Sequence, residues 1–484
     1  MRGMVYRGVR GTLRCMGDAE NMNDTIAALA TPPLMGAIGV IRLSGGDAIE
    51  IAGKVISGKS GDALDSFPAR QLCLGLVRDP SGDVLDEALA VVFPGPDSYT
   101  GDDVVELHCH GSPALLREVL RLLYAGGARP AQPGEFTRRA FLHGRMDLAQ
   151  AEAVIDLISA ETALAARNAA GQLGGALSRA IEEIWSSICD LCAHFQALVD
   201  YPEDDIPPLP TPDIIESLRR IGARLLGLAS TYDRGKILRE GVPCALIGKP
   251  NTGKSSLLNA LLGYERAIVT AQPGTTRDTL VESLHMGGHW LRIADTAGLR
   301  NPSGDVAERM GIDRAREAAR KAGLVLVVLD GSRSLDGKDG EALDMARGRA
   351  TIVLLNKSDL PHHADVDIAA IEASFPEVCR VSALTGQGLD ALDRMIGRVL
   401  DAGAGAGAGI HAGGTLLTNL RHAEAVTGAA EAVASAADAL GAGFTADVVL
   451  TELESALSNL GEITGRDLSA DIIDRVFSRF CVGK

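Results

Sequence analysis

Aromatic residues are scarce in this sequence and make up 4% of its 484 residues. Proteins that stack single-stranded nucleic acid on their side chains need more of them, so a base-stacking platform is disfavoured. Basic charge is scarce too, because 63 Asp and Glu residues outnumber 47 Lys and Arg residues and leave a net charge of −16. Any contact with RNA must therefore use a local patch or a partner protein.

Long apolar runs are missing as well, which predicts a soluble protein without a membrane-spanning helix. The eight cysteines are scattered and form neither a disulfide framework nor a four-cysteine zinc site. Cys189 and Cys192 make a CxxC pair inside a helical pattern, where a position in or near the core is favoured over a redox role. His108 and His110 share one face of a predicted strand, but no third ligand for a metal ion is evident.

Residues 1–21 contain four arginines and no acidic residue before Asp18. This composition fits a transit peptide. The alternative, which we favour, is a start extension ahead of a first residue at Met16 or Met22. Because no secretory signal sequence is evident, we expect a cytoplasmic protein.

The rest of the chain changes pattern several times. Residues 22–143 alternate short β-type runs with helices and predict an α+β domain. Residues 144–240 have apolar residues at helical spacing, as in a helical bundle. Residues 241–400 alternate apolar strands with helices, which is typical of a parallel sheet. Residues 401–415 form a Gly/Ala-rich linker and residues 416–484 are helical again, so we expect the α/β unit to be inserted into one helical domain.

The stretch GKPNTGKS (residues 248–255) is a phosphate-binding loop between a predicted strand and a helix. Its glycines let backbone N–H groups surround a phosphate chain. Lys254 supplies positive charge at the outer phosphates, and the hydroxyl of Ser255 can bind Mg²⁺. Because the spacing, the strand and the helix all agree, a chance match is improbable.

The stretch NKSD (residues 356–359) selects the nucleotide. Asp359 can accept hydrogen bonds from the ring N–H and the amino group of guanine, whereas adenine offers no such pair of donors. The stretch SAL (residues 382–384) is expected to close over the base. An ATP-dependent kinase is therefore disfavoured, and the sequence predicts a GTPase.

Two further stretches complete the GTPase pattern. DTAG (residues 295–298) ends a strand, where Asp295 suits the outer sphere of Mg²⁺ and the Gly298 N–H suits the γ-phosphate. GTTRD (residues 274–278) supplies Thr276 as a second Mg²⁺ ligand.

The residue after DTAG is Leu299, so the glutamine that orients water in Ras-like enzymes is missing. Glu308 is the best nearby carboxylate for that role. The charge of an arginine finger must also be replaced, and Asn251 could hold a monovalent cation against the phosphates. The alternative is that Asn251 only stabilises the loop.

These motifs carry a family resemblance. GKPNTGKSSLLNALLG, AQPGTTRDTL and DTAGLR resemble the TrmE–Era–EngA branch of GTPases. DTIAALATPP, GVIRLSG, FPGPDSYTGDDVVELHCHG, PGEFTRRAFLHGRMDLAQAEAV and GEITGRDLSADIIDRVFSRFCVGK narrow it to the MnmE (TrmE) family of tRNA modification GTPases. The resemblance implies an α+β N-terminal domain that binds tetrahydrofolate and dimerises, and a helical domain that carries an inserted Ras-like P-loop GTPase domain.

The resemblance also implies a function. Members of the family work with the FAD protein MnmG, as homodimers expected to form a heterotetramer with it. They add an aminomethyl-type (carboxymethylaminomethyl) group at C5 of the wobble uridine of certain tRNAs, with a carbon from a folate. The other candidate is a ribosome-assembly GTPase of the same branch that binds RNA without modifying it. That function would need an added RNA module, such as a KH domain, and the helical tail has nothing placed like one.

The family's site residues map onto this sequence as follows. K⁺ is expected at Asn251, Thr270, Gln272 and Thr275, and Mg²⁺ at Ser255 and Thr276. Glu308 matches the hydrolytic glutamate. Folate is expected at Arg42, Glu106, Arg145 and Lys484. GTP is expected to contact Asn251, Thr252, Gly253, Lys254, Ser255, Ser256, Thr270, Ala271, Gln272, Pro273, Gly274, Thr275, Thr276, Asp295, Thr296, Ala297, Gly298, Asn356, Lys357, Ser358, Asp359, Ser382, Ala383 and Leu384.

The chain ends in RFCVGK, and Cys481 matches the cysteine of the family's terminal motif. The preceding residues Leu468, Ile472, Ile473, Val476, Phe477 and Phe480 have helical apolar spacing. We expect this face to dock the tail and to direct Cys481 and Lys484 toward the N-terminal domain of the same or the partner subunit. Cys481 could then act as a nucleophile or an acid–base group in one-carbon transfer. The alternative is a cysteine that only packs.

Overall fold

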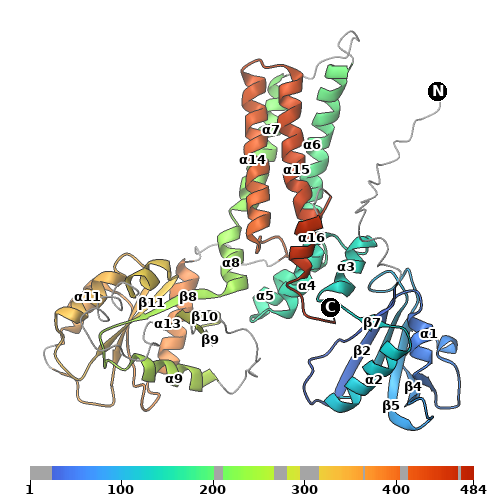
Figure 1. Ribbon diagram of the computed structural model, residues 1–484. Helices are drawn as coiled ribbons and strands as arrows, with labels where there is room; N and C mark the ends of the chain where they lie inside the picture. Colours follow the sequence, from blue (N-terminus) through green and yellow to red (C-terminus); the bar gives the residue numbers. More distant parts are fainter. Residues whose placement is uncertain are drawn as a thin grey trace. The chain divides into compact units, whose positions relative to one another are not determined.

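The structure is a computed structural model, and it describes residues 24–200, 211–265, 281–294, 315–363, 366–403, 413–466 and 470–483. The chain divides into two compact units, which Figure 1 shows coloured along the sequence. The first comprises Met1–Ile155, Gln172–Arg219 and Glu431–Lys484. The second comprises Asp156–Gly171 and Arg220–Ala430.

The first unit contains a seven-stranded sheet in the order β3-β4-β5-β6-β2-β1-β7. All neighbours are antiparallel except β1 and β7, which run parallel. Its strands are β1 (Ile26–Leu29), β2 (Ile38–Ser44), β3 (Ile56–Gly58), β4 (Cys73–Arg78), β5 (Val84–Phe93), β6 (Val104–His110) and β7 (Arg129–Pro130). The predicted α+β architecture is present in this part of the chain.

Two helices, α1 (Ala48–Gly53) and α2 (Pro113–Ala125), cover one face of this sheet. The core between them is apolar and includes Leu43, Leu107 and Leu116. Side chains alternate between the faces of a strand, so every second residue of β2 and β6 points away from that core. Arg42 and Glu106 lie on the face opposite the core as a result.

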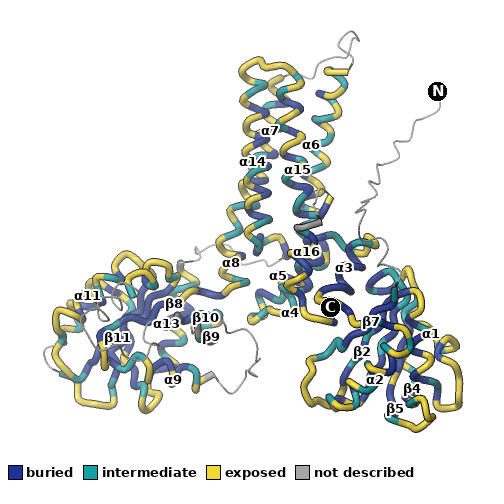
Figure 2. The backbone as a smooth tube through the Cα atoms, viewed as in Figure 1, coloured by how far each residue is buried: buried dark blue, intermediate teal, exposed yellow. Residues whose placement is uncertain are grey.

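The residues predicted to be helical form helices in the structure. Its helices are α3 (Glu135–Leu142), α4 (Leu148–Ile158), α5 (Ala163–Leu173), α6 (Ala176–Asp200), α7 (Thr211–Ala229), α8 (Tyr232–Glu240), α14 (Leu420–Gly441), α15 (Ala446–Thr464) and α16 (Ala470–Phe477). Helices α6 and α15 lie side by side, and buried residues follow one stripe of each (Figure 2). The stripe on α6 contains the buried residues Ile181, Ile184, Ile188, Leu191 and Phe195.

The second unit contains a six-stranded sheet in the order β13-β12-β11-β8-β10-β9, called the G sheet below. Its neighbours are parallel except for the antiparallel pair β9–β10. Its elements are β8 (Val242–Ile247), α9 (Lys254–Glu265), β9 (Val281–Met286), β10 (His289–Ala294), β11 (Leu324–Asp330), α11 (Gly337–Ala346), β12 (Thr351–Asn356), α12 (Ile368–Ser374), β13 (Val378–Arg380) and α13 (Leu389–Gly403). One core packs with α9 and α13 and another with α11 and α12. Because both faces are covered, residues 324–329 of β11 and residues 352–355 of β12 are apolar without interruption.

Within the described ranges of the chain, no helix is long and apolar enough to cross a membrane.

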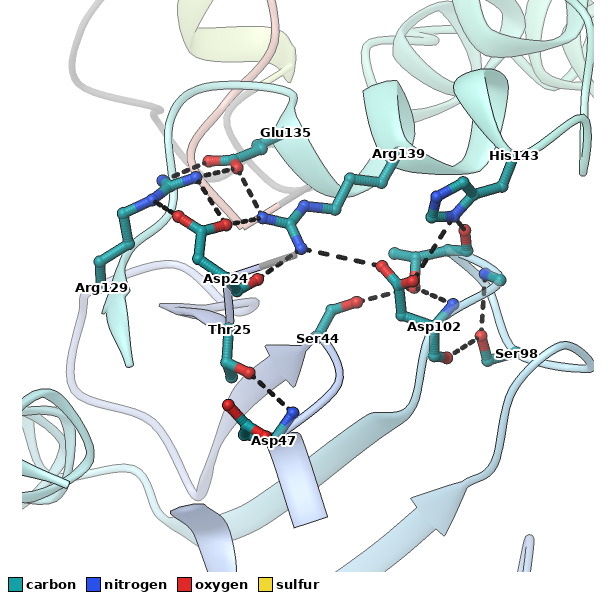
Figure 3. A network of polar contacts seen from close by, with 12 residues as sticks. Asp24, Thr25, Ser44, Asp47, Ser98, Asp102, Arg129, Glu135, Arg139 and His143 are labelled. Atoms are coloured by element: carbon teal, nitrogen blue, oxygen red, sulfur yellow. Dashed lines mark hydrogen bonds and ion pairs between the residues drawn. The ribbon is translucent and has the colours of Figure 1, made fainter. Parts of the chain in front are cut away.

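A network of ion pairs fixes the start of β1 to α3 and β7. Arg139 is 2% exposed, and its Nη2 lies 2.6 Å from Asp24 Oδ1 and 3.1 Å from Glu135 Oε1. Arg129 Nη2 lies 2.6 Å from the same Glu135 oxygen, and Arg129 Nε pairs with Asp24. The two guanidinium groups lie on either side of the two carboxylates (Figure 3). Each buried charge therefore has a partner, as burial requires.

This network predicts an acid-sensitive N-terminal domain. Burial alone would raise the pKa of Asp24 and Glu135, but the hydrogen bonds and charges of Arg129 and Arg139 outweigh it and lower both pKa values. A carboxyl with a lowered folded pKa stabilises the fold above its unfolded pKa and loses this contribution as the pH falls. We expect amide hydrogen exchange in β1 and β7 to accelerate as the pH falls from about 5 to 3, beyond the intrinsic pH effect.

Arg139→Met tests the cause of this acid sensitivity. Removing one partner of a buried ion pair costs about 3–5 kcal/mol, and the remaining carboxylates then gain from protonation. The variant should be less stable at pH 7 and should lose part of the acid sensitivity, because Arg129 still pairs with both carboxylates. Arg121→Met removes an exposed pair with Glu118 and serves as the control. An unchanged pH dependence in Arg139→Met would contradict this account.

Candidate functional site

The phosphate-binding loop lies between β8 and α9 of the G sheet. It turns through three residues with positive φ, namely Gly248 (148°), Asn251 (66°) and Gly253 (93°). A Cβ atom on Gly253 would lie 2.3 Å from Asn356 Nδ2, and one on Gly248 would lie 2.3 Å from Val328 O. Both glycines are therefore required by close approach as well as by backbone conformation.

Lys254 lies across this loop. Its Nζ donates hydrogen bonds to the carbonyl oxygens of Gly248 at 2.7 Å and Lys249 at 2.8 Å. The hydroxyl of Thr252 donates to the same Lys249 oxygen at 3.0 Å. Asn251, Ser255 and Ser256 are exposed around it. The loop is thus formed, with its ammonium group at the position where phosphate oxygens can replace carbonyl oxygens.

Asn356 joins three of the predicted nucleotide-binding segments. Its Nδ2 donates to Thr252 O at 2.8 Å, and its Oδ1 accepts from the Ala383 N–H at 3.1 Å. The side chain is buried, with the residue 2% exposed. The phosphate-binding loop, the NKSD stretch and the SAL stretch are therefore held together by one amide.

Asp359 lies at the edge where guanine is expected. The hydroxyl of Ser382 donates to Asp359 Oδ1 at 2.6 Å, which fixes the direction of the exposed carboxylate. Ser382 Oγ in turn accepts from the Thr385 N–H at 3.1 Å. Leu384 is 84% exposed beside this pair. The carboxylate and an apolar side chain are thus both accessible to a purine base.

Lys357 holds the turn that precedes Asp359. It has a φ of 65°, and its Nζ lies 2.7 Å from Asp330 Oδ2 at the end of β11. Burial alone would raise the pKa of Asp330, but hydrogen bonds from Lys357 and Ser332 lower it. The ion pair therefore secures the turn that presents Asp359.

Lys249 was not identified from the sequence. Its Nζ lies 2.8 Å from Asp336 Oδ2 and also pairs with Asp339, and these two residues form the capping box of α11. Burial alone would lower the pKa of Lys249, but the hydrogen bonds to both carboxylates raise it. The loop is therefore tied to α11. The motif leaves this position open, so no local signal indicated the contact.

In the N-terminal domain, Arg42 and Glu106 are direct neighbours in the register of β2 and β6. Arg42 Nε donates to Glu106 Oε1 at 2.8 Å, and Arg42 Nη2 lies 2.7 Å from the same oxygen. The guanidinium carbon lies 5.4 Å from the ring centroid of Tyr99 and 5.8 Å from that of Phe136. Glu106 Oε2 also lies 3.5 Å from His108 Nε2. Two of the predicted folate residues are thus brought together among aromatic rings.

Arg145 has a different partner. Its Nη1 lies 3.7 Å from Asp97 Oδ1. Asp97 and Tyr99 belong to one loop, so Arg145 and Arg42 contact neighbouring residues of that loop. The structure does not pair Arg145 with Glu106.

The C-terminal tail is tied to the N-terminal domain of its own chain. Val482 forms an antiparallel bridge with Pro133, and the Gly134 N–H donates to Cys481 O at 3.4 Å. Gly483 has a φ of 98°, and a Cβ there would lie 2.2 Å from Leu29 O. Ile473, Val476, Phe477 and Phe480 of the predicted apolar face are buried against α3 and α4. Cys481 itself is exposed at the end of this docked tail.

Comparison with known proteins decides the family. Residues 25–145 match the model described as the GTP-binding protein TrmE N-terminus, and residues 148–481 match the MnmE helical domain. A curated tRNA modification GTPase MnmE from Moorella thermoacetica is 44% identical over 96% of this chain and 100% of its own length. The chain belongs to the MnmE family of tRNA modification GTPases. The resemblance seen in the sequence is thereby confirmed.

Other members of the MnmE family are similarly close. The relative from Heliobacterium modesticaldum is 42% identical over 96% of this chain and 100% of its own length. The relative from Clostridioides difficile is 39% identical, again over 96% of this chain and 100% of its own. Among solved structures, an Aquifex aeolicus Era variant bound to GDP.AlF4- is 28% identical over 39% of this chain and 65% of that chain, with a TM-score of 0.27. At that score the likeness supports no argument about the fold.

Several predicted residues of the MnmE-family site lie outside the described residues. They are Thr270, Ala271, Gln272, Pro273, Gly274, Thr275, Thr276, Asp295, Thr296, Ala297, Gly298, Glu308, Leu468 and Lys484. Their functions stay predictions, including those of most K⁺ ligands and of the hydrolytic glutamate.

The other cysteines and histidines are consistent with structural positions. Burial raises the pKa of Cys189, and it raises that of Cys192 to about 12, so neither thiol is a ready thiolate. His110 Nδ1 lies 2.6 Å from Asp86 Oδ1, and His108 lies beside Glu106. Among the described residues, no group of three or more His, Cys, Asp or Glu side chains is arranged to hold a metal ion.

Proposed function

We propose that this chain is a K⁺-dependent GTPase that acts with an MnmG-type FAD protein. Together they would add an aminomethyl-type (carboxymethylaminomethyl) group at C5 of the wobble uridine of certain tRNAs. The observation that carries the GTPase part is the Asn356 amide, which joins the phosphate-binding loop to the segment bearing Asp359. Membership of the MnmE family supports the tRNA part.

The chemistry divides between two parts of the chain: the loops of the G sheet, and the N-terminal domain with the C-terminal tail. Lys254 binds the phosphates and Asp359 selects guanine. Ser255 and Thr276 would hold Mg²⁺, which would supply positive charge to neutralise the phosphates. Ser255 fits this function because it is exposed in the first turn of α9, directly after Lys254. Glu308 positions the attacking water. A reduced folate bound near Arg42 and Glu106 supplies the carbon, with Arg145, Lys484 and Cys481 as the further contacts.

The net charge of the chain supports the need for a partner protein. A net charge of −16 leaves little general attraction for tRNA, so a second protein must provide part of the contact. We propose a homodimer formed through the N-terminal domain, joined to the FAD protein as a heterotetramer. We further propose that residues 22–143 form the folate-binding domain and that residues 241–400 are inserted into the helical domain.

Nucleoside analysis tests the function as a whole. A strain without this gene should lack the modified wobble uridine in tRNA digests analysed by mass spectrometry. The wild-type gene should restore it, and a Lys254→Ala gene should not. If the modified nucleosides are present in the deletion strain, the chain does not perform this modification, and RNA binding without modification becomes the better explanation.

K⁺ dependence is the next expected result. GTP turnover should fall by as much as about 10³-fold when K⁺ is replaced by Na⁺ at equal ionic strength, because a cation at Asn251 replaces the arginine finger. Phosphate release measured in both salts gives the comparison. Asn251→Ala should be equally slow in either salt. Equal wild-type turnover in K⁺ and Na⁺ would refute this dependence.

Folate binding is expected to require Glu106. The carboxylate is aligned by Arg42 and can accept a hydrogen bond from the pterin N–H edge. Glu106→Ala should weaken the binding of a reduced folate by about 10-fold or more, because it removes a charge-assisted hydrogen bond. Calorimetry measures both affinities. Glu118→Ala, which removes an exposed carboxylate paired with Arg121, should bind normally, and equal binding by Glu106→Ala would rule out this pocket.

A further inference from the structure

The G sheet is joined to the preceding helix by a single residue. Helix α8 ends at Glu240 and β8 begins at Val242, with Gly241 between them. Gly241 has a φ of 81°, and a Cβ on it would lie 2.9 Å from Trp290 O. At its other end β8 leads directly into the phosphate-binding loop. One six-residue strand therefore connects the nucleotide site to this glycine.

A single carboxylate contacts two segments of the chain, one that precedes the G sheet in the sequence and one that follows it. Asp156, in the last turn of α4, has a side chain that is 10% exposed. Its Oδ1 lies 2.9 Å from Arg239 Nε, two residues before Gly241. Its Oδ2 accepts a hydrogen bond from Thr418 Oγ1 at 3.0 Å, in the segment that follows the G sheet. The segment that leads into the G sheet, with Arg239, and the segment that returns from it, with Thr418, are therefore both bound to the Asp156 carboxylate.

The returning segment is held along its backbone as well. The Leu417 N–H donates to Thr231 Oγ1 at 3.0 Å, and Asn168 Nδ2 donates to Leu416 O at 3.4 Å. A Cβ on Gly235 of α8 would lie only 2.0 Å from Leu417 O, so the two backbones are in direct contact. We call Asp156, Asn168, Thr231, Arg239 and Thr418 the clamp.

The clamp is not packed completely. A cavity of about 10 Å³ is lined by Asp156, Asn168, Leu238, Arg239 and Thr418, among others. Asn168 is 1% exposed, and its Oδ1 has no hydrogen-bond partner among the residues that the structure describes. A buried acceptor without a partner is costly. The Asn168 oxygen and the cavity therefore lie together beside Asp156, at the point where the two segments meet.

We propose that Asp156 is a positioning residue that couples the GTPase cycle to tRNA modification. A change at the phosphate-binding loop moves β8, and Gly241 passes that movement to α8. Because Arg239 and Thr418 share Asp156, both segments must then move together. The proposal rests on the proposed function, because GTP hydrolysis can be coupled to tRNA modification only if the chain takes part in that modification. A purely structural function of Asp156 would alter stability alone.

The first test compares the two reactions in one preparation. Asp156→Ala should hydrolyse GTP at the wild-type rate, while the number of GTP molecules consumed per modified tRNA rises by about 10-fold or more. Asp156→Glu, which keeps a carboxylate for Arg239, should restore the coupling in part. Lys321→Ala removes an exposed pair with Glu317 in the same unit and should leave the ratio unchanged. A wild-type ratio in Asp156→Ala overturns the proposal.

The second test does not require modification activity. Amide hydrogen exchange at Leu417 should differ between the GDP-bound and GTP-analogue-bound wild-type chain, and this difference should vanish in Asp156→Ala. Thermal unfolding confirms that the variant is folded. The same nucleotide-dependent difference in the variant, or none in the wild type, overturns the proposal. If the wild-type chain makes no modified nucleoside, the proposed function fails. The hydrogen-exchange result still shows whether the clamp responds to the bound nucleotide through Asp156.

Discussion

Cys481→Ser is expected to abolish tRNA modification while GTP hydrolysis continues at the wild-type rate. The tail is fixed by the bridge between Val482 and Pro133 and by the hydrogen bond from Gly134, so the position of residue 481 does not depend on its own side chain. Cysteines that fill a core are buried, whereas Cys481 is exposed. Its exposure therefore favours a chemical function over packing.

The size of the effect follows from the chemistry. A serine hydroxyl at this position is a far weaker nucleophile and acid–base group than a thiol, so modification should fall by about 10²-fold or more. Modified nucleosides are counted by mass spectrometry after reaction with the partner protein. Cys73→Ser, a half-buried cysteine on β4, is the matched control and should modify tRNA normally. Wild-type modification by Cys481→Ser would show that the thiol is not required.

Much of the fold could be predicted because burial leaves a direct pattern in the sequence. The runs LVLVVLD and TIVLLN coincide with β11 and β12, since the interior of a strand covered on both faces must be apolar and polar residues stand only at its ends. The break between α7 and α8 could not be predicted. Neither proline nor glycine stands at residues 230 and 231. Thr231 at the break accepts a hydrogen bond from the N–H of Leu417, which is distant in the sequence. Local spacing carries no information about that contact.

The candidate site divides in the same way. Gly248, Gly253 and Lys254 were predictable because phosphate binding fixes both their types and their spacing. The bridging function of Asn356 was not, because it depends on how the loops between strands meet. The pairing of Arg42 with Glu106 was not predictable either. Alternation within each strand indicates the face, but only the register of β2 against β6 makes the two residues neighbours.

Asp359→Asn is expected to exchange guanine specificity for xanthine specificity. The ring N–H and the amino group of guanine both donate hydrogen bonds, and the carboxylate accepts them. Because Ser382 Oγ already accepts from the Thr385 N–H, its own hydrogen is directed at Oδ1 of residue 359. In the variant the same hydroxyl holds the amide oxygen, so the NH₂ group faces the base. The NH₂ group of the asparagine then faces the amino group of guanine, and two donors oppose each other. Xanthine has a carbonyl oxygen at that position, which accepts a hydrogen bond from the NH₂ group.

Affinities for GTP and XTP measure this exchange directly. GTP binding should weaken by about 10²-fold or more, because a charge-assisted pair is lost and donors are left opposed, while XTP binding should strengthen. Asp344→Asn changes an exposed carboxylate on α11 that pairs with Arg347, and both affinities should be unaffected there. Ser382→Ala in the Asp359→Asn background should reduce the preference for XTP, because the amide is no longer oriented. If Asp359→Asn binds GTP as tightly as the wild-type chain, Asp359 does not read the base.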